Sequence, residues 1–387
     1  MPRKILFITG TRADFGKLKS LIRVLEDHPD FEPWIFITGM HTLSLYGDTW
    51  IEVRKSGFSR LHVFHNQYVG EPMPSILANT IQGLSRYVAE LDPDLIVVHG
   101  DRVEALAGAL VGTLSNIRVA HVEGGERSGT VDELIRHAVS KISHLHFVAN
   151  EEARFRLIQM GENDSHIFVV GSPDIDVMLS DSLPSIEAVR AKYEIPFEEY
   201  GVVLFHPVTT EHSSMGIYAR QLVDAVLASG RNFVVIYPNN DLGTSLILPE
   251  YERLREHPNI RLYPSIAFEY FLTLLENAQL MVGNSSAGVR EAPVYGVRSI
   301  NIGTRQNLRF TGESIRNVSY ESKEILEVIQ ADFGRPAERA TSYFGDGRSA
   351  EHFLWAMTDG HVFHVPQQKV FKDLSSLSLV TMAQEVA

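Results

Sequence analysis

The alternation of short apolar runs with helical patterns constrains the fold of this chain more than any other feature. A helical pattern over 17–25 follows the first apolar run, and further apolar runs recur along the first half of the sequence. This rhythm is typical of a doubly wound parallel sheet with helices on both faces. The strand-like runs of the first half are 5–8, 34–37, 95–98, 118–122, 145–149 and 167–170.

A second series of the same kind follows. Helical patterns over 217–228 and 268–277 separate its strands. The predicted strands are 201–205, 233–237, 260–262, 280–282 and 299–302, the last of which closes the series. Because 387 residues exceed one ordinary core, we expect an α/β protein with two Rossmann-like parallel-sheet domains that face a cleft.

Turn-forming residues place the domain boundary. Gly171-Ser172-Pro173-Asp174 interrupts the strand and helix patterns, as Gly and Pro commonly do between structural elements. We therefore expect an N-terminal domain over 1–171 and a C-terminal domain over 172–365. The last segment, 366–387, is helix-prone and is expected to pack back across the domains.

Charge and cysteine content exclude several classes of protein. A net charge of −13 argues against binding to a nucleic-acid backbone or an anionic membrane surface. The absence of cysteine excludes a disulfide scaffold, a thiolate nucleophile and a Cys-ligated metal. The first apolar run is too short for an export signal, and no stretch approaches a membrane span. We therefore expect a cytoplasmic protein with no nucleic-acid or membrane partner.

Two strand ends in the first half open into acid-rich sequence. Asp101 follows the run 95–98, and Glu123 follows the run 118–122. The carboxyl ends of parallel strands line one rim of a sheet, where open α/β sheets bind ligands. Simple capping of the following helices is the alternative. Two Gly-flanked acids, each with its own histidine, His99 and His121, favour a binding or catalytic site.

The first turn carries candidate anion ligands. Gly10-Thr11-Arg12 follows the first predicted strand but lacks the full glycine fingerprint of a dinucleotide site. Arg12 and Lys17 add donors that suit a pyrophosphate. Ordinary surface charges on a first helix are the alternative interpretation.

The second half carries further candidates for binding an anion. Ser285 and Ser286 stand at a predicted strand–turn–helix entry, where hydroxyls and free N–H groups suit a phosphate, although capping alone is the alternative. Glu291 is expected about two turns into that helix, within reach of a ribose diol. His206 follows another strand and is a candidate phosphate contact.

The sequence contains no motif typical of a metal site or of a serine hydrolase. His144 and His146 share one face of a strand, but no His-Glu-x-x-His or comparable ligand set accompanies them. No Gly-x-Ser-x-Gly elbow is present. We expect no metal and no cofactor.

Several motifs together resemble the hydrolysing UDP-N-acetylglucosamine 2-epimerases, the sialic-acid-pathway branch of the UDP-sugar 2-epimerases. The resemblance extends from Ile5 to about Gly347. Gly124-Gly125-Glu126-Arg127 differs from the Ala-Gly-Leu-Arg pattern of the non-hydrolysing branch. The matching motifs are 10–18, His99-Gly100-Asp101-Arg102, 121–126, 128–132 with 135–137, His206-Pro207-Val208-Thr209-Thr210, Gly283-Asn284-Ser285-Ser286 and Gly303-Thr304-Arg305-Gln306.

The resemblance implies a GT-B-like fold that binds UDP in the cleft. The implied reaction releases UDP and free N-acetylmannosamine by elimination to 2-acetamidoglucal and then hydration, without cofactor or metal. A homodimer or homotetramer is also implied. Carried over by position, the catalytic carboxylates are Asp101, Glu123 and Asp132. The implied UDP-sugar contacts are Arg12, Lys17, Arg102, His206, Asn239, Ser265, Phe268, Ser285, Ser286, Glu291 and Arg305.

Three alternatives stay open at this point. The same chemistry on UDP-N,N'-diacetylbacillosamine is one, because the sequence gives no independent indication of the sugar's C4 and C6 pockets. A UDP-sugar-dependent glycosyltransferase is another, since one fold hosts many functions. A nucleotide-sugar sensor is the third, although retention of all three carboxylates argues against it. Which carboxylate acts as base and which as acid is not assigned.

Overall fold

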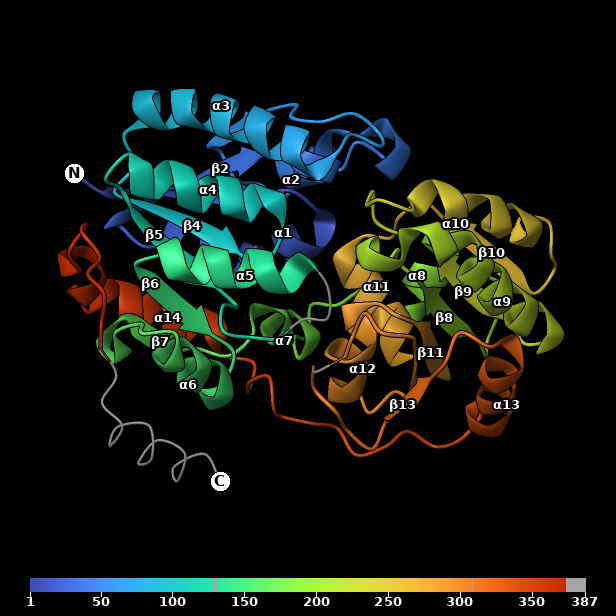
Figure 1. The fold of residues 1–387 in the computed structure, drawn as a ribbon. Helices are drawn as coiled ribbons and strands as arrows, with labels where there is room; N and C mark the ends of the chain where they lie inside the picture. Colours follow the sequence, from blue (N-terminus) through green and yellow to red (C-terminus); the bar gives the residue numbers. More distant parts are fainter. Residues whose placement is uncertain (128–130, 308, 374–387) are drawn as a thin grey trace. The chain divides into compact units, whose positions relative to one another are not determined.

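The computed structural model describes residues 1–127, 131–307 and 309–373, which form two compact units (Figure 1). Unit 1 comprises Met1–Glu126, Asp132–Ser180 and the chain from Tyr343. Unit 2 comprises Arg127–Val131 and Asp181–Ser342.

Unit 1 contains a seven-stranded sheet in which every pair of neighbouring strands is parallel. Its strands are β1 (Arg3–Thr9), β2 (Phe31–Ile37), β3 (Leu61–Val63), β4 (Leu95–His99), β5 (Arg118–Val122), β6 (Leu145–Val148) and β7 (Ile167–Val169). Their order is β3-β2-β1-β4-β5-β6-β7. The chain therefore winds outward from β1 in both directions, and the order reverses between β1 and β4.

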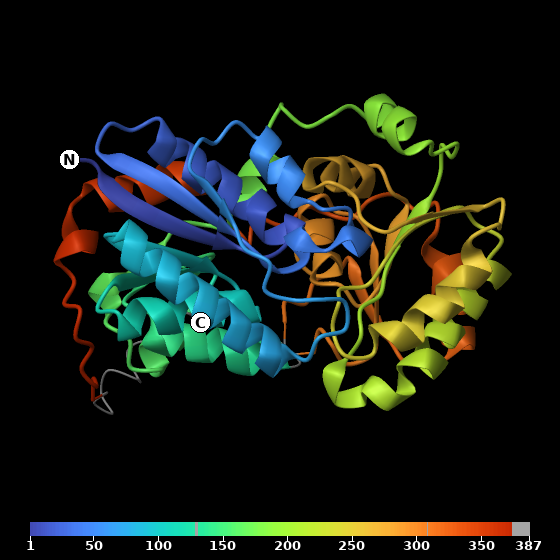
Figure 2. The ribbon, with the colours of Figure 1, turned by 90° about the horizontal axis from the view of Figure 1, so that it is seen from above.

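Helices cover both faces of this sheet (Figures 1 and 2). The α-helices are α1 (Arg12–Glu26), α2 (Trp50–Lys55), α3 (Met73–Leu91), α4 (Val103–Leu114), α5 (Val131–Ile142), α6 (Glu151–Gln159), α7 (Pro173–Met178) and α14 (Ser349–Thr358). Short 3₁₀ turns are η1 (Gly39–Thr42), η2 (Ser44–Tyr46), η3 (Asp164–His166) and η7 (His361–His364). α1, α7 and α14 pack together, and α3 packs on α4. A Cβ at Gly108 of α4 would lie 2.4 Å from Ile8, so glycine lets this helix approach the sheet closely.

Unit 2 contains a six-stranded parallel sheet in the order β10-β9-β8-β11-β12-β13. Its strands are β8 (Gly201–Leu204), β9 (Phe233–Ile236), β10 (Ile260–Tyr263), β11 (Leu280–Gly283), β12 (Ser299–Ile302) and β13 (Ile315–Val318). Its α-helices are α8 (Ile186–Tyr193), α9 (Met215–Ala228), α10 (Thr244–Tyr251), α11 (Phe268–Glu276), α12 (Glu291–Val294) and α13 (Ser322–Asp332). Its 3₁₀ turns are η4 (Thr209–Ser214), η5 (Glu252–Leu254) and η6 (Ser286–Gly288).

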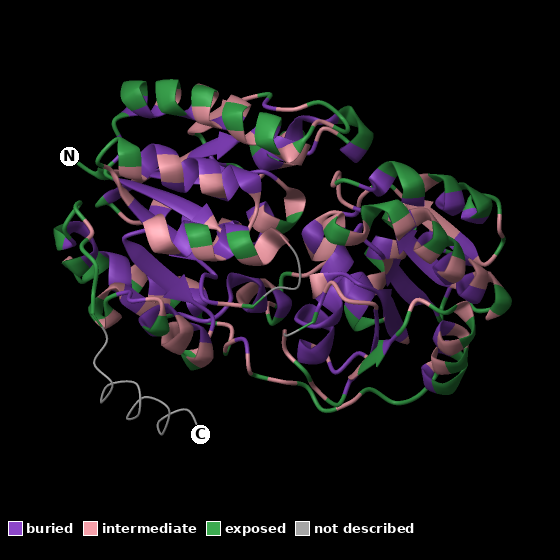
Figure 3. Cartoon of the chain, viewed as in Figure 1, coloured by how far each residue is buried: buried purple, intermediate pink, exposed green. Residues whose placement is uncertain are grey.

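The central strands of both sheets are buried on both faces, whereas the outer faces of the helices are exposed (Figure 3). This burial explains why the strands appear in the sequence as continuous apolar runs rather than as alternating patterns. The predicted α/β class with two Rossmann-like sheets is confirmed, and each predicted strand is present.

Two edge strands were not predicted. β3 is partly exposed along its length, and β13 has two exposed residues out of four, so neither forms an apolar run. β13 pairs with β12 in parallel, so the expectation that 299–302 closes the second series is wrong.

The division into units also differs from the expected boundaries at 171 and 365. α7 and α14 both pack on α1, which places 172–180 and the chain from Tyr343 in unit 1. The described part of the final segment contacts unit 1: Arg118 donates to the Val365 carbonyl, and His144 Nε2 lies 2.9 Å from the Gln367 carbonyl. The rest of the predicted helical tail, 374–387, lies outside the described residues. Among the described residues, no helix is long and apolar enough to cross a membrane.

Candidate active site

Asp101 and Glu123 lie at the same rim of the unit 1 sheet. β4 and β5 are neighbouring parallel strands in which His99 pairs with Val122, so the two acids follow adjacent strand ends. Arg102 is the N-cap of α4, and α5 begins only at Val131. The expected common rim is therefore confirmed, and neither acid serves as the cap of the following helix.

Arg136 connects the two acid-bearing loops. It lies on the buried face of α5 and forms an ion pair with the carboxylate of Asp101. Its Nη1 also donates to the backbone carbonyl of Glu123 at 2.6 Å. A planar guanidinium holds such a two-point geometry better than an ammonium does. The third predicted carboxylate, Asp132, lies one turn earlier in the same helix.

The Glu123 carboxylate is buried among polar groups. Ser172 Oγ donates to its Oε1, and His99 Nε2 lies 2.9 Å from its Oε2. Lys17 Nζ is 3.5 Å from the same Oε2 and 3.0 Å from Asp174. The Glu123 side chain is only 4% exposed, so these groups replace the water that would otherwise solvate its charge. Hydrogen bonds and a nearby cation favour the ionised carboxylate.

The backbone at Glu123 is itself unusual. Its φ is +60°, in the left-handed region that a residue with a side chain seldom occupies. Gly125, two residues later, also has a positive φ, and a Cβ there would lie 2.3 Å from the Ala153 carbonyl oxygen. Backbone outliers of this kind concentrate at functional sites, where the surrounding structure holds them.

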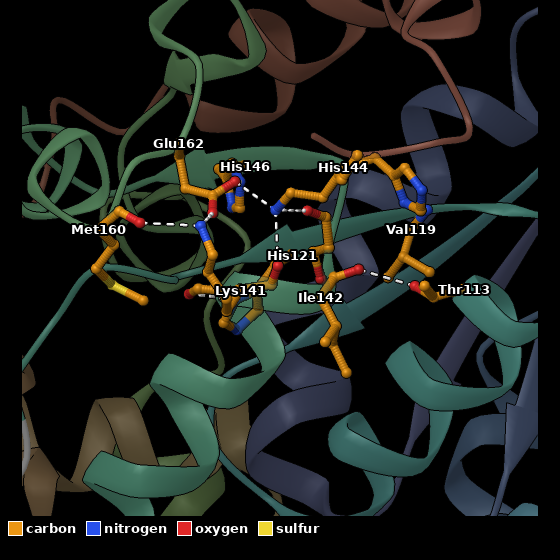
Figure 4. Close-up of polar contacts among 12 residues, drawn as sticks. Thr113, Val119, His121, Lys141, Ile142, His144, His146, Met160 and Glu162 are labelled. Carbon is orange, nitrogen blue, oxygen red and sulfur yellow. Dashed lines mark hydrogen bonds and ion pairs between the residues drawn. The ribbon is translucent and has the colours of Figure 1, made fainter. Parts of the chain in front are cut away.

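The other histidines singled out in unit 1 have structural partners. His121 is fully buried between the Ser140 hydroxyl and the Gly100 carbonyl, and burial lowers its pKa to about 3. His146 contacts Glu162, and burial lowers its pKa as well (Figure 4). Among the described residues, no group of three or more His, Asp or Glu side chains is placed to hold a metal ion.

The cationic candidates of unit 1 have different surroundings. Lys17 is buried in its ion pairs, so the alternative of an ordinary surface charge does not apply to it. Arg12 is the first residue of α1 and pairs with Glu52. Arg102 lies beside Glu104 at 3.7 Å. Roles for these side chains in binding a pyrophosphate stay predictions.

The candidate residues of unit 2 gather at one rim of its sheet. Each follows the carboxyl end of a strand or begins the next helix, which is where ligands bind in open α/β sheets. In strand order they are His206 after β8, Asn239 after β9, Ser265 and Phe268 after β10, Ser285 and Ser286 after β11, and Arg305 after β12.

Asn284 links three of these strand ends. Its side-chain oxygen accepts from the His206 N–H at 2.6 Å, and its amide donates to the His206 carbonyl at 2.8 Å. Its own carbonyl accepts from Arg305 at 3.2 Å and from Gln306 at 2.7 Å. The preceding Gly283 has a φ of +140°, and a Cβ there would lie 2.1 Å from the Leu204 carbonyl oxygen, so only glycine fits.

The His206 ring has a defined tautomer in its neutral form. Its Nδ1 accepts a hydrogen bond from the Asn239 backbone N–H at 3.0 Å. The ring proton must then be on Nε2, which makes that nitrogen a donor. A donor at a strand end suits an anionic oxygen.

The segment after β11 differs from the expected continuous helix. Ser285 caps the single turn η6 through the Ala287 N–H at 3.3 Å, and a separate four-residue helix, α12, begins at Glu291. The expectation that Glu291 lies two turns into a helix is therefore wrong. A turn at Val289 and Arg290 separates the two pieces, and Pro293 lacks the N–H that a longer helix would need. Glu291 is buried, and its contact with a ribose stays a prediction.

Comparison with known proteins identifies the family. The model of the UDP-N-acetylglucosamine 2-epimerase family matches residues 23–358. The chain belongs to this family. Its sequence is 51% identical over 376 residues to a UDP-N-acetylglucosamine 2-epimerase from Neisseria meningitidis serogroup B, covering 96% of this chain and all of that protein. It is 34% identical over 355 residues to the UDP-N,N'-diacetylbacillosamine 2-epimerase (hydrolyzing) of Legionella pneumophila, covering 91% and 94%.

Solved structures of 2-epimerases share the fold of this family member. A Neisseria meningitidis UDP-GlcNAc 2-epimerase bound to UDP-GlcNAc superposes with a TM-score of 0.77 at 19% identity, covering 92% of this chain and all of that one. A Methanocaldococcus jannaschii UDP-GlcNAc 2-epimerase in complex with UDP-GlcNAc and UDP gives 0.79 at 23% identity, with the same coverage. The GT-B-like fold expected from the sequence is therefore shown.

Sequence reasoning assigned no role to four residues that contact the candidate site residues. The sequence does contain a pattern that could have indicated Arg136: it is a charged residue on the apolar face of an amphipathic helix, beside Ile135 and Val139. Asn284 belongs to the matching motif Gly283-Asn284-Ser285-Ser286, but the sequence indicated no role for its side chain. Ser172 and Asp174 belong to the segment interpreted as a domain boundary.

Proposed function

We propose that the protein is a hydrolysing 2-epimerase that converts UDP-N-acetylglucosamine and water to UDP and free N-acetylmannosamine. The observation that carries the proposal is the pair Asp101 and Glu123, held at adjacent strand ends by Arg136, His99 and Ser172. Two carboxylates in fixed positions suit a reaction that removes a proton from one carbon and returns one to it.

The proposed reaction has two balanced steps. In the first, a carboxylate takes the C2 proton, the C1–O bond breaks, UDP leaves with the bonding electrons, and 2-acetamidoglucal forms. In the second, water adds its oxygen to C1 and gives up one proton to a carboxylate, while a carboxylic acid delivers a proton to C2 from the opposite face. Asp101, Glu123 and Asp132 are the proposed acid and base groups, with their individual roles unassigned.

Unit 2 is proposed to bind the nucleotide. His206 Nε2 is a donor suited to a phosphate oxygen, and Ser285, Ser286 and Arg305 follow neighbouring strand ends. Removal of the C2 proton is unfavourable unless the leaving diphosphate is stabilised, so groups that bind it serve both binding and rate.

Relatives support the choice of sugar and of branch. The 51% identity to a UDP-N-acetylglucosamine 2-epimerase favours that substrate over UDP-N,N'-diacetylbacillosamine, whose named epimerase is 34% identical. The Legionella relative is named as hydrolyzing, and the motif 124–127 resembles that branch. We accordingly propose a cytoplasmic homo-oligomeric enzyme that supplies N-acetylmannosamine to sialic acid biosynthesis.

Incubation with UDP-N-acetylglucosamine alone, followed by NMR, tests the function. We expect UDP and free N-acetylmannosamine, with deuterium at C2 when the solvent is D₂O. Accumulation of UDP-N-acetylmannosamine would instead show a non-hydrolysing enzyme. No turnover without an acceptor would favour a glycosyltransferase, and faster turnover of UDP-N,N'-diacetylbacillosamine would change the assigned sugar.

A further inference from the structure

The segment Gly171-Ser172-Pro173-Asp174 lies inside unit 1 and reaches the candidate catalytic carboxylate. It follows β7 and begins α7, with Pro173 as the first helical residue. Ser172 is fully buried, and Asp174 is 1% exposed. The backbone of this segment is held by the Ser172 N–H, which donates to the Phe344 carbonyl at 2.8 Å. Two buried polar side chains on such a fixed turn require a role beyond changing the chain direction.

Both side chains are linked to Glu123, Ser172 directly and Asp174 through Lys17. The Ser172 hydroxyl donates to Oε1 of Glu123 directly. Asp174 acts through Lys17, whose Nζ lies 3.0 Å from the Asp174 Oδ2 and 3.5 Å from the Glu123 Oε2. The ammonium is thus shared between two buried carboxylates and lies closer to Asp174.

These contacts have opposite effects on the charge of Glu123. A donated hydrogen bond from Ser172 stabilises the ionised carboxylate. The negative charge of Asp174 disfavours a second charge nearby and draws Lys17 away from Glu123. Further charged or titratable groups near Glu123 include His99 from β4, and Arg136 from α5, which donates to the Glu123 carbonyl and pairs with Asp101.

We propose that Ser172 and Asp174 are positioning residues that set the orientation and the ionisation of Glu123. Ser172 fixes one carboxylate oxygen, and Asp174 restrains Lys17 from a closer approach to the other. This inference rests on the proposed function, in which Glu123 exchanges a proton with the substrate. Neither residue is required to touch the substrate itself.

The pH dependence of Ser172→Ala and Asp174→Asn tests the proposal with opposite expected signs. For Ser172→Ala, the limb of the kcat/KM profile that reports the ionisation of Glu123 moves to higher pH by about half to one unit, and kcat falls about 10-fold. For Asp174→Asn, the same limb moves to lower pH, because a like charge is removed and Lys17 is free to approach Glu123. Ser172→Thr keeps the hydroxyl and restores the profile.

Matched controls separate positioning from loss of a buried group. Ser143→Ala removes another buried hydroxyl, which donates to the Val139 carbonyl. Asp332→Asn neutralises another buried carboxylate, which lies 3.0 Å from Arg316 in unit 2. Both controls are expected to keep the wild-type pH profile. If Ser172→Ala and Asp174→Asn also keep it, with kcat within about 2-fold, the proposal is overturned.

A measurement independent of turnover keeps this inference distinct from the proposed reaction. Carbon-13 NMR of labelled glutamate carboxyls, assigned with Glu123→Gln, follows the titration of Glu123 in each variant. The same opposite displacements are expected even if wild-type protein fails to turn over the UDP-sugar, a result that would remove only the proposed function. Coincident titrations in the wild type and both variants would overturn the positioning role. If one variant does not fold, the other carries the test.

Discussion

Arg136 forms an ion pair with Asp101 at the carboxyl ends of the unit 1 strands, where Asp101 follows β4. The same guanidinium donates to the backbone carbonyl of Glu123, so one buried side chain fixes two loops that begin at neighbouring strands. The relative position of the two carboxylates therefore depends on a helix residue and not only on the sheet.

Arg136→Lys is expected to lower kcat about 10- to 100-fold while the protein stays folded. A lysine ammonium is a point charge and cannot span Asp101 and the Glu123 carbonyl as the planar fork does. Steady-state kinetics and circular dichroism provide the measurement. Arg154→Lys is the control, because that guanidinium pairs with Asp164 and Glu151 at the surface. Wild-type kcat in Arg136→Lys would show that the linkage has no catalytic role.

Asp101→Asn is expected to reduce turnover at least 100-fold and to leave UDP affinity within about 3-fold of wild type. The amide keeps the shape of the side chain but can neither take up nor deliver the transferred proton, and UDP is proposed to bind to unit 2. Product NMR and calorimetry measure the two quantities. Asp359→Asn, on an exposed residue, is the matched control. Near-normal kcat would remove Asp101 from the catalytic set.

His206→Ala is expected to weaken UDP binding about 10-fold, close to 1.4 kcal/mol, because it removes a donor proposed to contact the diphosphate. His206→Gln is the comparison, since its amide offers a donor on a side chain of similar length. Isothermal calorimetry with UDP measures both. An unchanged dissociation constant for the alanine variant would place His206 outside the nucleotide site.

The sequence predicted most strands because buried parallel strands are continuous apolar runs. It predicted where the candidate residues lie because ligands bind at the rim formed by the carboxyl ends of such strands. It did not predict β3 or β13, whose side chains are partly exposed and form no such run. Its interpretation of the Glu291 segment was wrong, since a turn at Val289 and Arg290 divides the segment into the single turn η6 and the short helix α12.

The role of Ser172 shows a further limit of sequence reasoning. Gly, Ser and Pro mark a turn wherever they occur, and no local pattern shows which buried group a turn faces. The tertiary structure brings Ser172 to Glu123, 49 positions earlier in the chain. Asn284 is a similar case, because it bonds to His206, which lies 78 positions earlier in the chain.

Stability is expected to decrease as pH falls from about 6.5. Burial lowers the pKa of His41 to about 4 and that of His121 to about 3, whereas an unfolded histidine titrates near 6.5. Between these values the unfolded chain binds protons that the native state does not, so the free energy of unfolding decreases as the pH decreases. At pH 5 the decrease relative to neutral pH is roughly 2 kcal/mol per histidine.

Urea unfolding at pH 7.5, 6 and 5 measures this dependence. His41→Gln is expected to flatten the slope, even though it loses contacts to Thr9 and Thr49 at every pH. His361→Gln, on an exposed histidine, is expected to leave the slope unchanged. Equal slopes in His41→Gln and the wild type would contradict the buried neutral state of His41.

Lys369 fixes the last described segment to unit 1 through a buried carboxylate. Its Nζ lies 2.5 Å from Glu162 Oε2 and donates to the Lys141 and Ser143 carbonyls, each at 2.7 Å. Those carbonyls lie at the end of α5, where helical partners are missing. Glu162 also lies 3.1 Å from Lys141 and 3.0 Å from His146 (Figure 4). Burial opposes ionisation of Glu162, but His146 and Lys369 lower its pKa to about 2.

Lys369→Met is expected to destabilise the protein by about 2–4 kcal/mol in urea unfolding at pH 7.5, because Glu162 would stay buried with one cation fewer. The double variant Glu162→Gln/Lys369→Met should recover part of the loss, since no unbalanced charge then remains. Lys372→Met, on an exposed lysine of the same segment, is the matched control. If Lys369→Met and Lys372→Met unfold at the same urea concentration, the segment from Gln367 to Lys372 contributes no stability through Glu162, and its contacts with α5 are incidental to the fold.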